Sequence, residues 1–159
     1  MTRKIITPIV IILIIAGIYF LSQNKTQNPE PIKTTEAGTL LAGTATPLYD
    51  FTQAQYDEAL KSGKTILLYF YAKWCPICRE ETANALYPAF NQLNTDKLVG
   101  FRVNFKDDDT DENEVALARK FGVLYQHTKV ILKPDSSSQK FPDSWNLARY
   151  LSEIANVLK

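Results

Sequence analysis

The sequence has only two cysteines and one histidine among 159 residues, and its charges nearly cancel, with 18 Lys and Arg against 17 Asp and Glu. Two cysteines are too few for a disulfide-stapled mini-protein, or for a zinc site built from four thiolates. A net charge of +1 provides no electrostatic footprint for nucleic acid, so we expect no nucleic-acid partner. The length suits no more than one ordinary domain.

The apolar residues, 45% of the chain, are unevenly distributed. An apolar run from Ile5 to Leu21 follows Arg3 and Lys4. Its 17 residues would span about 26 Å as a helix, the short end of what crosses a bilayer. No small-residue cleavage site follows, so we predict an uncleaved signal anchor over residues 1–21, with a cleaved signal peptide as the alternative. The positive charge before the run predicts a single-pass membrane protein with a cytoplasmic N-terminus and its domain in the periplasm or outside the cell.

The remainder of the chain divides into a polar stretch and a domain-sized segment. Residues 22–46 are rich in Thr, Asn, Gln, Pro and Gly, which predicts a flexible linker because so little apolar surface cannot offset the chain entropy. In residues 47–159, strand-like runs such as 66–72 and 98–105 alternate with helical patterns. We expect helices over residues 52–63, 76–93, 107–121 and 143–159. This alternation predicts an α/β domain with helices on both faces of a sheet.

The two cysteines lie three positions apart, directly after the predicted strand 66–72 and at the start of a helix. At a helix N-terminus the unpaired backbone N–H groups and the helix dipole favour an anion, so this position favours a thiolate at Cys75. Pro76 suits the first helical position, where its missing N–H has no partner to lose. We interpret Cys75 as the nucleophile and Cys78 as the resolving thiol. A structural disulfide and half of a zinc site are the alternatives.

The string from Ile66 to Arg79, a hydrophobic strand followed by aromatic-Ala-x-Trp-Cys-x-x-Cys-Arg, resembles the thioredoxin superfamily. The resemblance implies a thioredoxin fold over residues 47–159, with a central mixed sheet of about four or five strands flanked by helices. It also implies thiol–disulfide exchange through Cys75 and Cys78 without an organic cofactor. Exported proteins with thiols or disulfides are the expected substrates, and a membrane redox partner is expected to supply or remove electrons. The sequence does not decide whether the protein reduces or oxidises its substrates. The expected neighbours of the active site are Trp74, Pro76, Ile77, His127 and Thr128.

The sequence departs from the family pattern at several positions. Tyr69 occupies the place of a buried carboxylate six residues before the first cysteine, and Ala83 replaces a helix proline. His127 stands where the family has a cis-proline, although the threonine that follows it is present as Thr128. A cis bond before a residue other than proline costs about 2.5–4 kcal/mol, so we predict a trans bond between Gln126 and His127.

The only histidine is therefore expected close to both thiols. Cys75, Cys78 and His127 form a ligand set that suits zinc, copper or an iron–sulfur cluster, which makes a metal-handling protein of copper or heme assembly one alternative function. His127 as a residue that tunes the thiolate, and His127 as an ordinary loop residue, are two further interpretations. A non-catalytic module with a structural disulfide is the remaining alternative.

Overall fold

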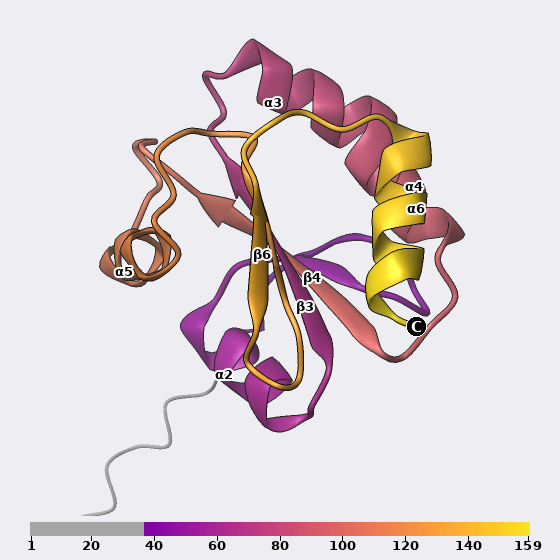
Figure 1. The fold of residues 1–159 in the computed structure, drawn as a ribbon. Coiled ribbons are helices and arrows are strands. Elements are labelled where there is room, and N and C mark those ends of the chain that lie inside the picture. The colour runs from indigo at the N-terminus through magenta and orange to yellow at the C-terminus, as the bar shows by residue number, and fades with distance from the viewer. Residues whose placement is uncertain (1–36) are drawn as a thin grey trace, which may run out of the picture. The chain divides into compact units, whose positions relative to one another are not determined.

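Six strands in one mixed sheet, with helices packed on both faces, make up the part of the chain that the computed structural model describes, residues 37–159 (Figure 1). The strands are β1 (Leu40–Ala42), β2 (Leu48–Asp50), β3 (Thr65–Tyr71), β4 (Leu98–Asn104), β5 (Lys129–Leu132) and β6 (Ser138–Phe141). The helical segments are α2 (Gln53–Lys61), α3 (Pro76–Glu81), η1 (Thr82–Leu86), α4 (Tyr87–Gln92), α5 (Glu112–Lys120) and α6 (Leu147–Val157). None of these helices is both long enough and apolar enough to cross a membrane. The predicted anchor lies outside the described residues.

The strand order is β1-β2-β4-β3-β5-β6. The apolar run of β3 lies between β4, which is parallel to it, and β5, which is antiparallel. Six of the seven β3 residues are buried, as expected for a strand covered on both faces. The mixed α/β sheet is confirmed, but the expectation of four or five strands was too low.

The additional strand is β1, which lies inside the stretch predicted to be a linker. It pairs antiparallel with β2, and the nearby Gly38 N–H donates to Gln55 Oε1 at 2.8 Å. Thr46 is fully buried and its hydroxyl donates to the carbonyl of Thr95 at 2.8 Å. The sheet therefore begins before residue 47, which corrects the predicted linker boundary, whereas residues 22–36 lie outside the described part. Three residues are too few for an alternating pattern to show in the sequence.

Each face of the sheet has its own hydrophobic core. One core joins the sheet to α2 and α5 through residues such as Tyr56, Phe101 and Leu117. The other core joins it to the helix that begins at α3 and to α6 through residues such as Phe90 and Ile154. The two helical layers hold the sheet between them (Figure 1).

The helix predicted over residues 76–93 forms as α3, a π-helical turn η1 and α4. Pro88 has no N–H to donate to a preceding carbonyl, and its ring crowds the turn before it. The π-turn immediately precedes α4, at the position where this disturbance is expected.

Two other helices begin later than predicted. The helix predicted to begin near residue 107 starts at Glu112, and the helix predicted to begin at residue 143 starts after its N-cap residue, Asn146.

A buried ion pair connects the helical layer that begins with α3 to the sheet. Lys129 Nζ lies 2.7 Å from Glu81 Oε1, and both side chains are almost completely inaccessible to solvent. The same ammonium donates to the carbonyls of His127 at 2.7 Å and Asp143 at 2.5 Å. Glu81 Oε1 also accepts from the backbone N–H of Trp145 at 2.9 Å. Burial lowers the pKa of Lys129, and the carboxylate of Glu81 opposes that shift.

Replacement of Lys129 by methionine is expected to leave Glu81 buried without its counter-ion, at a cost of about 3–5 kcal/mol in the free energy of unfolding. The double variant Glu81→Gln, Lys129→Met removes both charges and is expected to recover a large part of the loss. Urea denaturation of the three proteins measures both effects. A loss below about 1 kcal/mol in the single variant, the size typical of an exposed pair, would contradict this assignment.

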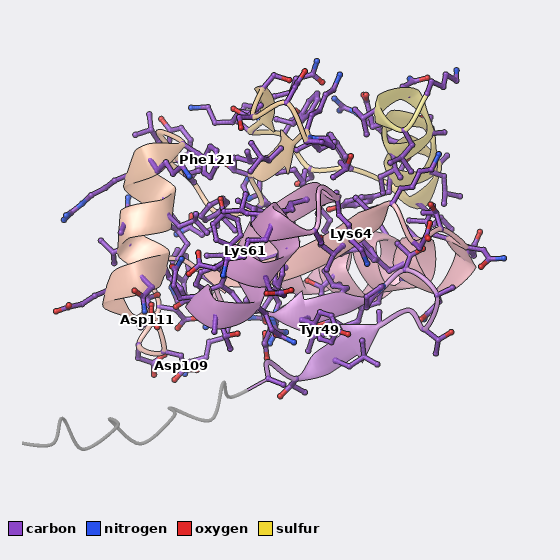
Figure 2. The ribbon with its side chains drawn as sticks, turned by 90° about the horizontal axis from the view of Figure 1, so that it is seen from below. Tyr49, Lys61, Lys64, Asp109, Asp111 and Phe121 are labelled. Atoms are coloured by element: carbon purple, nitrogen blue, oxygen red, sulfur yellow. The ribbon has the colours of Figure 1, made fainter. Side chains whose placement is uncertain are left out.

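A capping box fixes the start of α5. Figure 2 labels its first member, Asp111, at this end of the helix. Asp111 Oδ1 accepts from the Glu114 N–H at 2.8 Å, and Glu114 Oε2 accepts from the Asp111 N–H at 2.9 Å. Glu114 Oε1 accepts in addition from the Asn104 N–H at the end of β4, at 2.7 Å, so the carboxylate ties the helix to the sheet. Burial raises the pKa of Glu114 to about 7.

Glu114 is expected to make stability depend on pH. Because its folded pKa of about 7 exceeds the ordinary value of 4.5, its contribution is complete below pH 4.5 and is lost as the pH rises through 7. The free energy of unfolding of Glu114→Gln should therefore fall less steeply over this range than that of the wild type. Glu112→Gln, at an exposed position of the same first turn, is the matched control. Its free energy of unfolding should change with pH as steeply as that of the wild type. Equal slopes in wild type and Glu114→Gln would contradict the prediction.

Candidate active site

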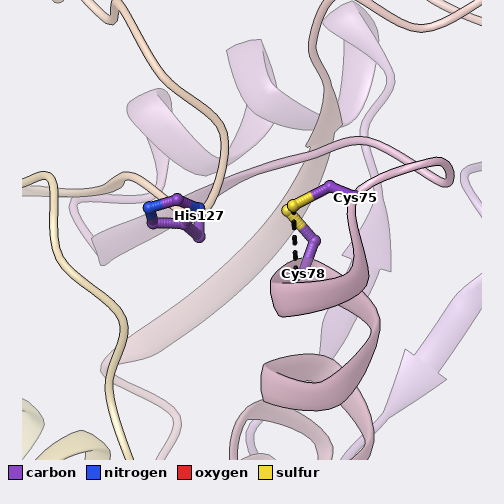
Figure 3. Close-up of side chains that lie close together, drawn as sticks. All are labelled: Cys75, Cys78 and His127. Carbon is purple, nitrogen blue, oxygen red and sulfur yellow. Dashed lines mark hydrogen bonds between the residues drawn. The ribbon is translucent and has the colours of Figure 1, made fainter.

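Cys75 and Cys78 lie where the chain leaves β3 and enters α3. Cys75 is the N-cap residue of α3, and Pro76 follows as a first-turn proline. The Cys78 N–H donates to Cys75 Sγ at 3.2 Å, so one of the free backbone donors of the helix N-terminus points at this sulfur (Figure 3). A donor in this position interacts favourably with negative charge on the acceptor sulfur.

The two thiols differ in their surroundings. Cys78 is completely buried, whereas Cys75 keeps 6% of its surface exposed. Burial, followed by the hydrogen bond with Cys75, raises the pKa of Cys78 to about 12, and backbone hydrogen bonds from Ala72 and His127 partly oppose this rise. Cys78 is therefore held protonated, whereas Cys75 is the only one of the two thiols with any exposed area. This asymmetry matches one attacking thiol and one thiol that acts later.

The sheet topology brings His127 to the cysteines. β5 runs antiparallel to β3 and pairs Tyr69 with Lys129, so the loop before β5 lies at the end of β3 from which the cysteines follow. The ligand atoms of Cys75, Cys78 and His127 all lie within 4.8 Å of one another. Figure 3 shows the three side chains side by side. All peptide bonds among residues 37–159 are trans, so the predicted trans bond before His127 is confirmed.

The His127 side chain is half-buried and lacks a full set of partners. Its Nδ1 is buried and has no hydrogen-bond partner among the described residues. Burial, together with the nearby positive charge of Lys129, lowers the pKa of His127, so the imidazole is neutral at neutral pH. The backbone φ of 50° lies in the left-handed region, which histidine adopts more readily than most residues. A neutral imidazole with a free ring nitrogen therefore faces the dithiol.

The sequence analysis missed the carboxylate that lies under this site. Tyr69 occupies the family's carboxylate position, but its hydroxyl lies 3.3 Å from Glu81 Oε2 and 3.5 Å from the Cys78 carbonyl. Tyr150 donates a second phenolic hydrogen bond to Glu81, at 2.8 Å. α3 thus supplies the acidic group that β3 lacks. This group is Glu81. The sequence signal for it was its position three residues after Cys78, which places both side chains on one side of a helix.

Exposed apolar side chains surround the dithiol. Trp74 and Ile77 are each at least half exposed, and Leu124 and Tyr125 stand out from the loop before His127. Trp74 Nε1 donates to the carbonyl of Lys106 at 2.9 Å, which fixes the indole beside the motif. Thr128, in contrast, is buried, and its hydroxyl donates to the carbonyl of Tyr125 at 2.8 Å. The exposed apolar side chains around the dithiol thus form an apolar contact surface next to Cys75.

Two basic residues beside the motif are engaged elsewhere. Lys73 Nζ pairs with Asp108 and Asp109, and Arg79 donates to the Lys73 carbonyl at 2.8 Å. The acidic loop before α5 therefore neutralises the lysine next to Cys75. The electropositive group that contacts Cys75 Sγ is consequently the backbone N–H at the start of α3.

Similar proteins agree with this geometry. The family model named Thioredoxin matches residues 47–156. Thioredoxin H4 of Arabidopsis thaliana is 37% identical over 84 residues, which are 53% of this chain and 64% of that protein. The thiol:disulfide interchange protein DsbE of Escherichia coli K12 is 31% identical over 115 residues, which are 68% of this chain and 58% of that protein. The chain thus spans about three fifths of the length of these relatives.

The solved structures agree on the fold. A thioredoxin from Aeropyrum pernix superposes with a TM-score of 0.56 at 18% identity, over 78% of this chain and 97% of that one. At this identity the likeness concerns the fold alone. The family model, the order of the strands and the Cys75–Cys78 pair at the start of α3 together show that the chain belongs to the thioredoxin family.

Proposed function

We propose that the protein is a thiol–disulfide oxidoreductase that exchanges disulfides with exported proteins through Cys75 and Cys78. The observation that carries the proposal is the asymmetry of the two thiols. Cys75 caps α3 and accepts the Cys78 N–H at 3.2 Å, whereas Cys78 is fully buried and has a raised pKa. The relationship to proteins named thioredoxin and thiol:disulfide interchange protein supports the same chemistry.

In the reducing direction the Cys75 thiolate attacks one sulfur of a substrate disulfide. A bond forms between Cys75 Sγ and that sulfur, the substrate S–S bond breaks, and the second substrate sulfur leaves as a thiolate. The buried Cys78 retains its proton at this stage, because burial disfavours its charged form. The enzyme and the substrate are then joined by a mixed disulfide.

The second step closes the disulfide of the enzyme. Cys78 loses its proton and attacks Cys75 Sγ, so a Cys75–Cys78 bond forms and the substrate leaves as its second thiolate. Two electrons have passed from the enzyme to the substrate. Oxidation of a substrate dithiol is the reverse sequence, and the reduction potential of the pair distinguishes the two roles. A value near about −270 mV indicates a reductant, and one near about −120 mV an oxidant.

The surface around the sulfurs supports a polypeptide substrate. Trp74, Ile77, Leu124 and Tyr125 present apolar area around the edge of the site, and such patches mark contact surfaces for other proteins. We place the domain outside the cytoplasm, next to the membrane and its redox partner, on the basis of the charged and apolar pattern of residues 1–21.

Cys78→Ser is expected to accumulate a mixed disulfide with substrate, because Cys75 still attacks but nothing resolves the product. Cys75→Ser is expected to be inert in insulin reduction and to form no adduct. Non-reducing gel electrophoresis and the turbidity of precipitating insulin measure the two outcomes. Glu112→Gln, an exposed change outside the site that keeps both thiols, is the control and should keep wild-type activity. Equal and negligible rates in wild type and Cys75→Ser, with a disulfide that resists mild reductant, would instead indicate a structural bridge.

Deletion of residues 5–21 is expected to move the protein from the membrane pellet, after extraction at alkaline pH, to the supernatant. The full-length Cys78→Ser variant is the control and should stay with the membrane like the wild type. In intact cells stripped of their outer layers, added protease should degrade the domain. A shortened product released from wild-type cells would contradict the uncleaved anchor, and a protease-resistant domain would contradict its orientation.

A further inference from the structure

Three side chains that bind soft metals meet at the dithiol. The ligand atoms of Cys75, Cys78 and His127 lie within 4.8 Å of one another. In a tetrahedral zinc site with Zn–S bonds of about 2.3 Å, neighbouring sulfurs lie about 3.8 Å apart. The 4.8 Å limit covers all three pairs of ligand atoms, so no pair is more than about one ångström wider than this spacing. The separation therefore fits a shared metal ion.

The imidazole supplies a ligand atom that the protein leaves free. Nδ1 of His127 is buried and makes no hydrogen bond with any residue in 37–159. A buried polar nitrogen without a partner is costly, and coordination of a metal removes that cost. The left-handed φ of 50° at His127 is an uncommon conformation, kept here where it presents the ring to the sulfurs.

The charge of the site favours a divalent ion. Two thiolates bring two negative charges into a region where Cys78 is fully buried and Cys75 nearly so. Lys129 is paired with Glu81, and Lys73 with Asp108, so these cations are already neutralised. A divalent ion cancels the dithiolate, whereas a monovalent ion leaves one buried negative charge uncompensated. Zinc combines this charge with a preference for sulfur and imidazole ligands.

We propose that the reduced protein binds one Zn²⁺ through Cys75 Sγ, Cys78 Sγ and a ring nitrogen of His127, with the fourth position open to solvent. Three protein ligands and an open position characterise exchangeable rather than closed structural zinc sites. Binding replaces the two thiol protons, which are released to solvent. The inference uses the same thiols as the proposed function but requires no catalytic turnover.

Metal binding and disulfide formation exclude each other at this site. When a substrate disulfide oxidises the zinc-bound form, the two substrate sulfurs take up two electrons from the dithiolate and two protons from solvent. They then leave as thiols. The enzyme then holds the Cys75–Cys78 disulfide, whose sulfurs no longer carry the charge that binds Zn²⁺, and the ion is released. Zinc thus protects the dithiol, and oxidation of the dithiol frees the zinc.

The test is a zinc titration of the full-length chain, purified in mild detergent, against the chromophoric chelator 4-(2-pyridylazo)resorcinol. Reduced wild type is expected to bind one equivalent of Zn²⁺, and the oxidised protein and Cys78→Ser none. His127→Asn tolerates the left-handed backbone but lacks the imidazole, and its affinity should fall by at least about tenfold. Glu112→Gln, an exposed change in the first turn of α5, is the control and should bind like the wild type.

Equal affinity in His127→Asn and wild type, or zinc bound to the oxidised protein, would overturn the inference. X-ray absorption of zinc-loaded wild type provides a measurement independent of any variant. Scattering from two sulfurs and one imidazole supports the site, and a shell without imidazole refutes it. Insulin reduction by the metal-free proteins separates the two proposals. An active His127→Asn with unchanged zinc affinity refutes only the metal site, whereas a zinc-binding wild type as inert as Cys75→Ser refutes only the oxidoreductase.

Discussion

The buried pair of Glu81 and Lys129 is the interaction on which the site depends. Lys129 lies two residues after His127, and Glu81 lies three residues after Cys78. Removal of either partner leaves a charge in a low-dielectric interior, so α3 and β5 cannot move apart without a large penalty. The 2.7 Å contact between these side chains therefore ties α3, which carries Cys78, to the start of β5, which follows His127. Tyr69 and Tyr150 add phenolic hydrogen bonds to the same carboxylate.

The direction of β5 explains why the histidine and the thiols share one edge of the sheet. β3 ends where the chain turns toward Cys75, and β5 begins at that edge because the two strands are antiparallel. A parallel β5 would place its preceding loop at the opposite edge. The site thus combines a thiol at a helix N-terminus with a neutral imidazole from the loop before a neighbouring strand. Both proposed roles, thiol–disulfide exchange and Zn²⁺ binding, rest on this geometry.

Local patterns were sufficient for much of this structure. The continuous apolar run of β3, the cysteine at a helix start and the family resemblance predicted the α/β fold, the dithiol and a trans bond at His127. β1 was missed because three residues carry no period and owe their conformation to pairing with β2. The π-turn before Pro88 was missed as well, although the proline signalled a disturbance. The acidic loop was expected to open a helix, but its first residues pair with Lys73 instead.

The two cysteines and one histidine of the sequence determined which chemistry the chain is able to perform, because thiol spacing and helix position are local properties. The tertiary structure decided which groups surround them. Glu81 places a carboxylate beside the Tyr69 hydroxyl, and Lys129 neutralises it from a different element. Such pairings join residues 48 positions apart, and no local period encodes them. Only the folded sheet brings the single imidazole within 4.8 Å of both sulfurs.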